Sequence, residues 1–343
     1  MPGVLVHFVV AQRTLAKWRE CSDGPPFEPD DPVAVNAFNH GAVGPDLGYF
    51  PGGERLLSDL AHTLRTGALT RALIRSACTD AERAFAWGWL THVLADQSIH
   101  PWIGRGVGEL TRDSADVFVD GATEPCGHLR VEMGVDTWFG ARFPQARAIR
   151  LSPAFGSGAV GFMVDAYERV YGVTLSEDAF ARSHRAAAVR VGQALATHGV
   201  LHWLRTGGPI ERWLPSLPVL LRTCLRSTQV SELALSYLAP VSPEPWLIQG
   251  IEAEVDAQAD RFLAHYREGA VGLDDHNLDT GRLIRLDPEH TGTLRALRGL
   301  RELRDSESPP RPVGPRPSCR RPTHAADRLS AAPSCPALWE VRF

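Results

Sequence analysis

Three side chains of metal-binding type recur at four-residue intervals in one apolar segment, AERAFAWGWLTHVLADQSIHPW (81–102). They are His92, Asp96 and His100, and this spacing places them on one stripe of a helix. Apolar residues occupy almost every other side, which predicts a buried helix. Burying an ionised carboxylate with two imidazoles costs several kcal/mol unless the groups are paired or bind a metal. The alternatives are a metal site, or a buried His–Asp pair with a third histidine at the surface.

The spacing also limits how this helix could bind metal. Eight residues separate His92 from His100, which corresponds to ~12 Å along a helix axis. Zinc–ligand bonds are only about 2 Å long, so we do not expect one ion to be held by both histidines. The helix is instead predicted to serve two or three neighbouring ions, with Asp96 central and able to bridge them. Pro101 follows His100 and predicts that the helix ends there.

A second segment, CGHLRVEMGVDTWF (126–139), has related chemistry. His128 and Glu132 share one helix face, and Asp136 follows a turn later. A His/Glu pair with four-residue spacing is a standard way for one helix to offer two ligands to zinc. A surface ion pair is the simpler explanation of an isolated HxxxE, but its position soon after the first motif favours a metal site.

Three upstream segments contain further candidate ligands. His7 lies in the apolar run VLVHFVV, where a core histidine and a ligand are equally good interpretations. The glycine-rich loop 39–53 presents Asp46 after a proline, which is also ordinary turn chemistry; His40 in the same loop is an alternative ligand. His62 lies opposite the leucine stripe of its helix, so we expect it at the surface unless another element covers that face.

Helices are predicted to position nearly all of these residues, because alternating β-type patterns are scarce and Pro and Gly fall mostly between apolar helical segments. The fold class is therefore predicted to be all-α, a multi-helix bundle. Loops are predicted at 21–53 and 101–121. The predicted helices span 4–18, 54–66, 80–99, 126–140, 158–171, 176–206, 209–225, 228–238 and 247–268.

The C-terminal end of the chain differs in composition from the rest. Residues 305–343 are rich in Pro, Arg and Ser with few aliphatic side chains, which predicts a disordered tail after a domain at 1–304. The net charge is −4, yet residues 306–343 contain six arginines and three acidic residues, so the domain itself is more acidic than the whole chain. An acidic domain is not expected to hold a stable nucleic-acid partner or an anionic membrane.

The sequence also shows no pattern typical of a transmembrane helix or of a signal peptide. No apolar run approaches the roughly 20 residues that span a bilayer, which predicts no transmembrane segment. The N-terminal stretch has no basic region before its apolar residues and no small-residue cleavage site, so we see no signal peptide. These two observations predict a cytoplasmic protein.

Taken together, these motifs resemble the zinc-dependent phospholipase C family, which is related to the S1/P1 nucleases. Similar segments occur in the N-terminal domain of glycosylphosphatidylinositol-specific phospholipase D. The resemblance spans about residues 1–140 and rests on GPDLGYF (44–50), AFAWGWLTHVLADQSIHPW (84–102) and HLRVEMGVD (128–136), with His7 and His62.

The resemblance implies an all-α domain with a cluster of zinc ions in a cleft. Asp46 is implied to lie beside the cluster, as a ligand or as the carboxylate that orients the attacking water. Members of the family are typically secreted, and in these the mature N-terminus completes the third site. Because this sequence shows no signal peptide, we expect either two or three ions. The implied ligands are His62, His92 and Asp96 for one ion, with Asp96 bridging to a second; His100, His128 and Glu132 for another; and His7 for the third.

The implied reaction is phosphodiester hydrolysis by metal-activated water. A phospholipase C cleaves the glycerol–phosphate ester of a phospholipid and releases diacylglycerol and a phosphorylated head group. Tyr49 and Phe50 flank the implied ligands and are candidates for substrate binding, since aromatic rings contact a choline cation or stack on a base; they could equally be core residues. Two other functions stay open: an S1/P1-type nuclease, and a non-catalytic helical metal-binding scaffold.

Overall fold

Helices make up nearly all of the regular structure in the computed structural model, which describes residues 3–153, 155–205 and 241–306. The only strands in these ranges are β1 (His276–Asn277) and β2 (Arg282–Leu283), which pair antiparallel. The all-α prediction is therefore confirmed. The helices are α1 (Val4–Arg19), α2 (Pro32–Gly41), η1 (Pro45–Gly48), α3 (Arg55–Thr63), α4 (Thr66–Ser76), α5 (Asp80–Arg112), α6 (Pro125–Arg142), α7 (Pro144–Arg147), α8 (Phe155–Tyr171), α9 (Glu177–Arg205), α12 (Pro245–Arg267), η3 (Ile284–Leu286) and α13 (Thr291–Ser306).

Helix α5, with 33 residues, contains the HxxxDxxxH motif. A capping box begins it: Thr79 Oγ1 accepts a hydrogen bond from the backbone N–H of Glu82, and the Glu82 carboxylate accepts one from the N–H of Thr79. The predicted end near residue 99 is wrong, because the helix continues through Pro101 to Arg112. A proline leaves the carbonyl four residues earlier without its helical donor. The turn between β1 and β2 packs against this position, since a Cβ on Gly281 would meet the carbonyl oxygen of Gln97.

Helices α2 and α5 pack backbone to backbone through two glycines. A Cβ on Gly41 would overlap the carbonyl oxygen of Phe85, and a Cβ on Gly88 would overlap that of Phe38. The close approach aligns the end of α2 with the middle of α5. It thereby brings the Ala42 carbonyl, directly after α2, to the ring of His92.

Two apolar clusters flank the polar residues of α5. One contains the N-terminal half of α5 with α2, α3, α4 and α8, and the aromatic rings around Trp18 belong to it. The other contains the C-terminal half of α5 with the start of α1, α6 and the start of α12. The polar stripe of α5 therefore lies inside the packed domain.

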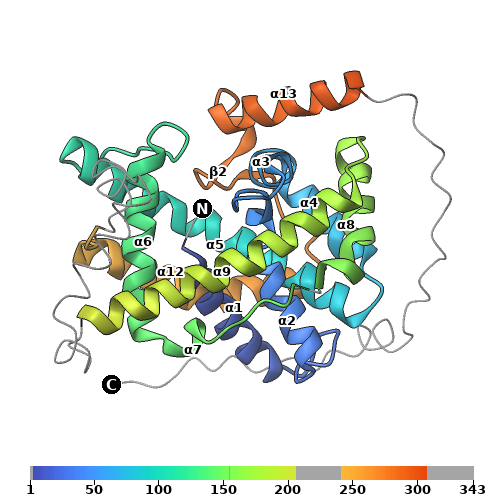
Figure 1. Ribbon diagram of the computed structural model, residues 1–343, viewed down its shortest axis with the longest axis horizontal. Helices are drawn as coiled ribbons and strands as arrows, with labels where there is room; N and C mark the ends of the chain where they lie inside the picture. Colours follow the sequence, from blue (N-terminus) through green and yellow to red (C-terminus); the bar gives the residue numbers. More distant parts are fainter. Residues whose placement is uncertain (1–2, 154, 206–240, 307–343) are drawn as a thin grey trace, which may run out of the picture. The chain divides into compact units, whose positions relative to one another are not determined.

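Several predicted boundaries differ from the structure. The predicted loop 21–53 contains α2 and η1, and α4 and α13 were not predicted. The predicted helices 209–225 and 228–238 lie outside the described residues, as does the predicted tail beyond residue 306. Helix α13 and the pair β1–β2 lie next to α3 (Figure 1). Within the ranges that the structure describes, no helix is both long enough and apolar enough to cross a bilayer.

Candidate metal centre

Five sequence-predicted residues meet where α1, η1, α3 and α5 converge. Each is at most 1% exposed. Their ligand atoms form two overlapping groups of three, and within each group all atoms lie within 4.8 Å of one another. The groups are His7, His92 and Asp96, and Asp46, His62 and His92.

Asp96 lies at the centre of this arrangement. Its Oδ1 is 3.2 Å from Nε2 of His7. Its Oδ2 is 3.0 Å from Nε2 of His92 and 3.7 Å from Nε2 of His62. The two oxygens thus face different histidines, which is the geometry that a carboxylate shared by two cation sites requires.

A third group adjoins these two through the end of the same helical stripe. His100 from α5 and His128 and Glu132 from α6 also have ligand atoms within 4.8 Å of one another. Oε1 of Glu132 lies 2.6 Å from Nε2 of His128 and 3.6 Å from Nε2 of His100. Asp96 links this group to the other two, because its Oδ2 is 3.9 Å from Nδ1 of His100.

Backbone carbonyls orient three of the histidine rings. Nδ1 of His62 lies 2.9 Å from the carbonyl oxygen of Ser58, and Nδ1 of His92 lies 3.0 Å from that of Ala42. Nδ1 of His100 contacts the carbonyl of Leu278. A carbonyl only accepts hydrogen bonds, so each Nδ1 carries a proton and each Nε2 is the nitrogen left to bind a metal. Metal-binding histidines are commonly held in this way.

The interior of the cluster is rich in polar atoms without hydrogen-bond partners among the described residues. They comprise both nitrogens of His7, Nε2 of His62, His92 and His100, and all carboxylate oxygens of Asp46 and Asp96. Buried polar atoms are nearly always satisfied in folded proteins. Nitrogen lone pairs and carboxylate oxygens converging within a few ångströms are a donor set that zinc prefers, so the residues present fit this metal.

The electrostatics of the cluster favour bound positive charge. Burial alone would raise the pKa of Asp96, but the charges of His92 and His100 outweigh it and hold that pKa well below its usual range. Burial lowers the pKa of His100, but Asp96 and Glu132 outweigh this and raise it to about 9. The carboxylates therefore stabilise protons on the histidines. A metal cation would compete with these protons for the same ring nitrogens.

Asp136 supports the cluster from outside it. Its carboxylate accepts hydrogen bonds from the backbone N–H groups of Leu5 and Val6, both at 3.2 Å, and so caps the start of α1. Burial raises the pKa of Asp136 to about 7, although these two donors oppose the shift. A Cβ on Gly3 would overlap this carboxylate. The contact fixes the start of α1, and with it His7, to α6.

His62 is buried, contrary to the expectation from its helical wheel. The apolar stripe of α3 packs on α8, where the hydroxyl groups of Tyr167 and Tyr171 reach its carbonyls. The opposite face of α3 is covered by η1, and the backbone N–H of Leu278 donates to the carbonyl of His62. A helical wheel cannot show such covering elements, and one of them, the segment at Leu278, lies over 200 positions along the chain from His62.

The three remaining candidate residues, Tyr49, Phe50 and His40, lie in different surroundings. Tyr49 lines a cleft beside the cluster, whereas Phe50 is buried in the second apolar cluster. His40 is remote from the ligand groups: its Nε2 donates to the carbonyl of Ser152 and its ring stacks on Phe155.

The cleft has a volume of about 360 Å³ and adjoins the third ligand group, that of His100, His128 and Glu132. Three of its residues, Arg55, Asp279 and Arg295, were not identified from the sequence. Arg295 and Asp279 belong to no recognisable motif, and only folding brings them beside α3. The complete lining is Gly48, Tyr49, Arg55, Gly121, Ala122, Pro125, His128, Leu129, Glu132, Asp279 and Arg295.

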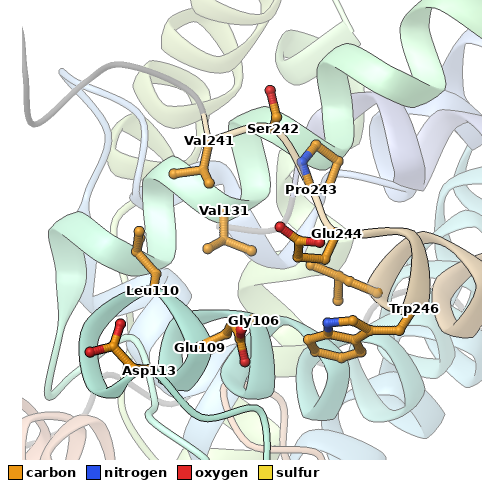
Figure 2. A pocket seen from close by; sticks show the side chains of 11 residues that line it. Gly106, Glu109, Leu110, Asp113, Val131, Val241, Ser242, Pro243, Glu244 and Trp246 are labelled. Carbon is orange, nitrogen blue, oxygen red and sulfur yellow. The ribbon is translucent and has the colours of Figure 1, made fainter.

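Another pocket, of about 270 Å³, lies between α5, α6 and the start of α12 (Figure 2). Trp246 forms one wall of this pocket, and the carboxylates of Glu109, Asp113 and Glu244 also line the pocket. None of the candidate ligands lines this pocket. Of these two pockets, the cleft beside the cluster is therefore the one that candidate ligands line.

Comparison with known proteins agrees with this site. No curated protein and no solved structure matches the chain. The model of one family, described as zinc dependent phospholipase C, matches residues 6–181, which is more than half of the chain. The matched span contains every residue of the three ligand groups. The chain therefore belongs to the zinc-dependent phospholipase C family.

Proposed function

We propose that this chain is a zinc-dependent phosphodiester hydrolase of the phospholipase C type. It would cleave the glycerol–phosphate ester of a phospholipid and release diacylglycerol. One observation carries the proposal: three adjoining groups of buried ligand atoms, linked by Asp96, lie beside a cleft to which His128 and Glu132 contribute. Membership of the family supports the same chemistry.

The three groups would hold two or three zinc ions per chain, because His92 belongs to two of them and only its Nε2 can bind an ion. His62, His92 and Asp46 surround one position, and His7 with the shared Asp96 and His92 surrounds the next. His100, His128 and Glu132 surround the position nearest the cleft. Zinc held there supplies water of lowered pKa and positive charge opposite the phosphate.

Asp46 is the proposed catalytic carboxylate. It is fully buried, and burial alone would raise its pKa, but His92 and His62 outweigh this and lower it. Asp46 is therefore ionised at neutral pH. Its Oδ1 lies 3.2 Å from Nε2 of His62, and the carboxylate can orient an attacking water or accept its proton.

Two assays test the proposed function on the zinc-loaded chain. The first follows bis(p-nitrophenyl) phosphate, a phosphodiester without a lipid or head group. The second follows release of diacylglycerol from phospholipid in mixed micelles. We expect activity in both, lost with a zinc chelator and restored by zinc.

A matched pair of variants distinguishes the cluster from the fold in general. His92→Ala removes a central ligand and should lower both activities by more than about 100-fold, beyond the loss typical of groups that only orient ligands. His265→Ala, on α12 and outside every ligand group, is the control and should keep both. Cleavage of single-stranded DNA without diacylglycerol release would instead support a nuclease, and bound zinc without any hydrolysis would support a scaffold.

A further inference from the structure

The walls of the cleft combine residues from both ends of the domain. Tyr49 follows η1, Arg55 is the first residue of α3, and Arg295 comes from α13. Asp279 comes from the turn between β1 and β2. Arg295 and Asp279 lie outside the residues that the family model matches. The cleft therefore has a wall that is not part of the matched family domain.

A partly buried ion pair fixes this wall in place. Nε and Nη2 of Arg295 donate to Oδ2 and Oδ1 of Asp59, both at 2.7 Å, in a bidentate pair. The hydroxyl of Tyr49 donates to the same Oδ1 at 3.2 Å. Asp59 is only 2% exposed, so its charge is compensated inside the wall. Arg295 and Tyr49 are thereby held in fixed positions at the cleft.

Arg55 is arranged differently. Its side chain is 63% exposed, and its Nε lies 3.6 Å from Oδ2 of Asp59, which Arg295 already engages. Its guanidinium carbon lies 6.0 Å from the centre of the Tyr49 ring. A guanidinium has five N–H donors. The terminal groups of Arg55 are therefore available at the cleft to a ligand that accepts hydrogen bonds.

These contacts disfavour a quaternary ammonium head group. Recognition of choline uses the faces of aromatic rings. Among the described residues, Tyr49 is the one Phe, Tyr or Trp ring of the cleft lining, and the Arg55 cation already lies over it. A choline cation would meet the guanidinium groups of Arg55 and Arg295, and it has no N–H or O–H to donate to the carboxylate of Asp279. A hydroxylated head group would instead accept hydrogen bonds from Arg55 and donate one to the carboxylate of Asp279.

We propose that Arg55, Arg295 and Asp279 select a phospholipid with a hydroxylated head group, such as glycerol, over one with choline. This inference rests on the proposed function, because it assigns the cleft beside the ligand groups as the head-group site. Arg55 supplies N–H donors to the head group, and the carboxylate of Asp279 accepts a hydrogen bond from it. The ion pair of Arg295 with Asp59 holds the wall in place. Glu132 and His128, which also line the cleft, belong to the third ligand group.

Binding of soluble head-group diesters tests the inference without requiring turnover. Isothermal titration of the zinc-loaded full-length chain with glycerophosphoglycerol and with glycerophosphocholine gives the ratio of their affinities. We expect glycerophosphoglycerol to bind at least ~10-fold more tightly, the effect of about one hydrogen bond to a charged group. Arg55→Gln should reduce this ratio by a similar factor. Arg298→Gln, an exposed arginine on α13 that does not line the cleft, is the control and should preserve it.

Other outcomes would overturn the inference. Equal binding of the two diesters, or tighter binding of glycerophosphocholine, would show that the guanidinium groups do not select the head group. A preference that Arg55→Gln leaves intact would show that it arises elsewhere, for example from the net charge of the ligand. Failure to hydrolyse bis(p-nitrophenyl) phosphate would count against the proposed function alone, since the binding ratio is measured independently of catalysis.

Discussion

At the scale of single residues, the arrangement around Asp96 explains why a charged side chain lies in an otherwise apolar helix. An isolated buried carboxylate is strongly unfavourable, and Asp96 is surrounded by His7, His62, His92 and His100 within 4 Å. Three of these rings are fixed by backbone carbonyls, so their orientation does not depend on bound ligand. The cluster is therefore preorganised for cations.

Glu132 gives a test confined to one ligand group. Glu132→Gln keeps the size of the side chain but removes the charge that lies 2.6 Å from Nε2 of His128. We expect the purified variant to retain one fewer zinc ion per chain, with an unchanged helical circular dichroism spectrum. Wild-type zinc content in this variant would remove Glu132 from the proposed site.

His40 gives a pH-dependent test of the core. Burial lowers the pKa of His40 to about 4, although its hydrogen bond to the Ser152 carbonyl opposes this. Because the unfolded chain binds this proton more readily, His40 contributes stability that is complete above about pH 6.5 and is lost as the pH falls towards 4. The shift corresponds to about 3 kcal/mol.

His40→Gln should therefore flatten the rise of unfolding free energy between pH 4 and 6.5, measured by urea denaturation. Loss of zinc in acid affects both proteins, so the difference between the two slopes isolates His40. Parallel slopes would show that His40 is not held neutral in the folded chain.

At the scale of elements, the most strongly patterned helices could be predicted and the covering elements could not. The continuous apolar character of 81–100 and its four-residue polar repeat identified the central helix and its stripe. Helix α2 is short and contains weak helix formers such as valine and asparagine, and it is stabilised by its glycine contact with α5 rather than by propensity. Pro101 did not end α5, because packing of the β1–β2 turn overrides the local preference.

The crossing of α2 and α5 can be tested with two glycines. Gly88→Ala places a methyl group against the Phe38 carbonyl and should lower the unfolding free energy by more than about 2 kcal/mol. Gly192→Ala on α9 meets nothing within 4 Å and should be neutral or stabilising by up to ~1 kcal/mol, since alanine favours helix. Equal effects in thermal unfolding would contradict the close approach of the two helices.

At the scale of the whole molecule, residues far apart in the chain complete one site. His7 and His128 are brought together around α5, and the carbonyl of Leu278 orients His100. His92, Asp96, His100, His128 and Glu132 could be proposed from the sequence because they lie in short motifs with helical spacing. The isolated residues His7, Asp46 and His62 could be assigned to the cluster only through the family resemblance. Arg295 and Asp279 could not, because their roles depend on contacts between α13, the β1–β2 turn and α3.

The proposed division at residue 305 predicts that the end of the chain is dispensable for the site. A chain ending after Ser306, which keeps all of α13, should retain wild-type zinc content and unfolding midpoint. Loss of either would assign residues 307–343 a structural role.

The most direct measurement is the zinc content of the purified wild-type chain by elemental analysis after extensive desalting. We predict two or three zinc ions per chain, and fewer in Asp96→Asn, which keeps the shape of the linking side chain but removes its charge. Absence of zinc from the wild-type chain after reconstitution with the metal would contradict the account and leave the buried histidines with a structural role.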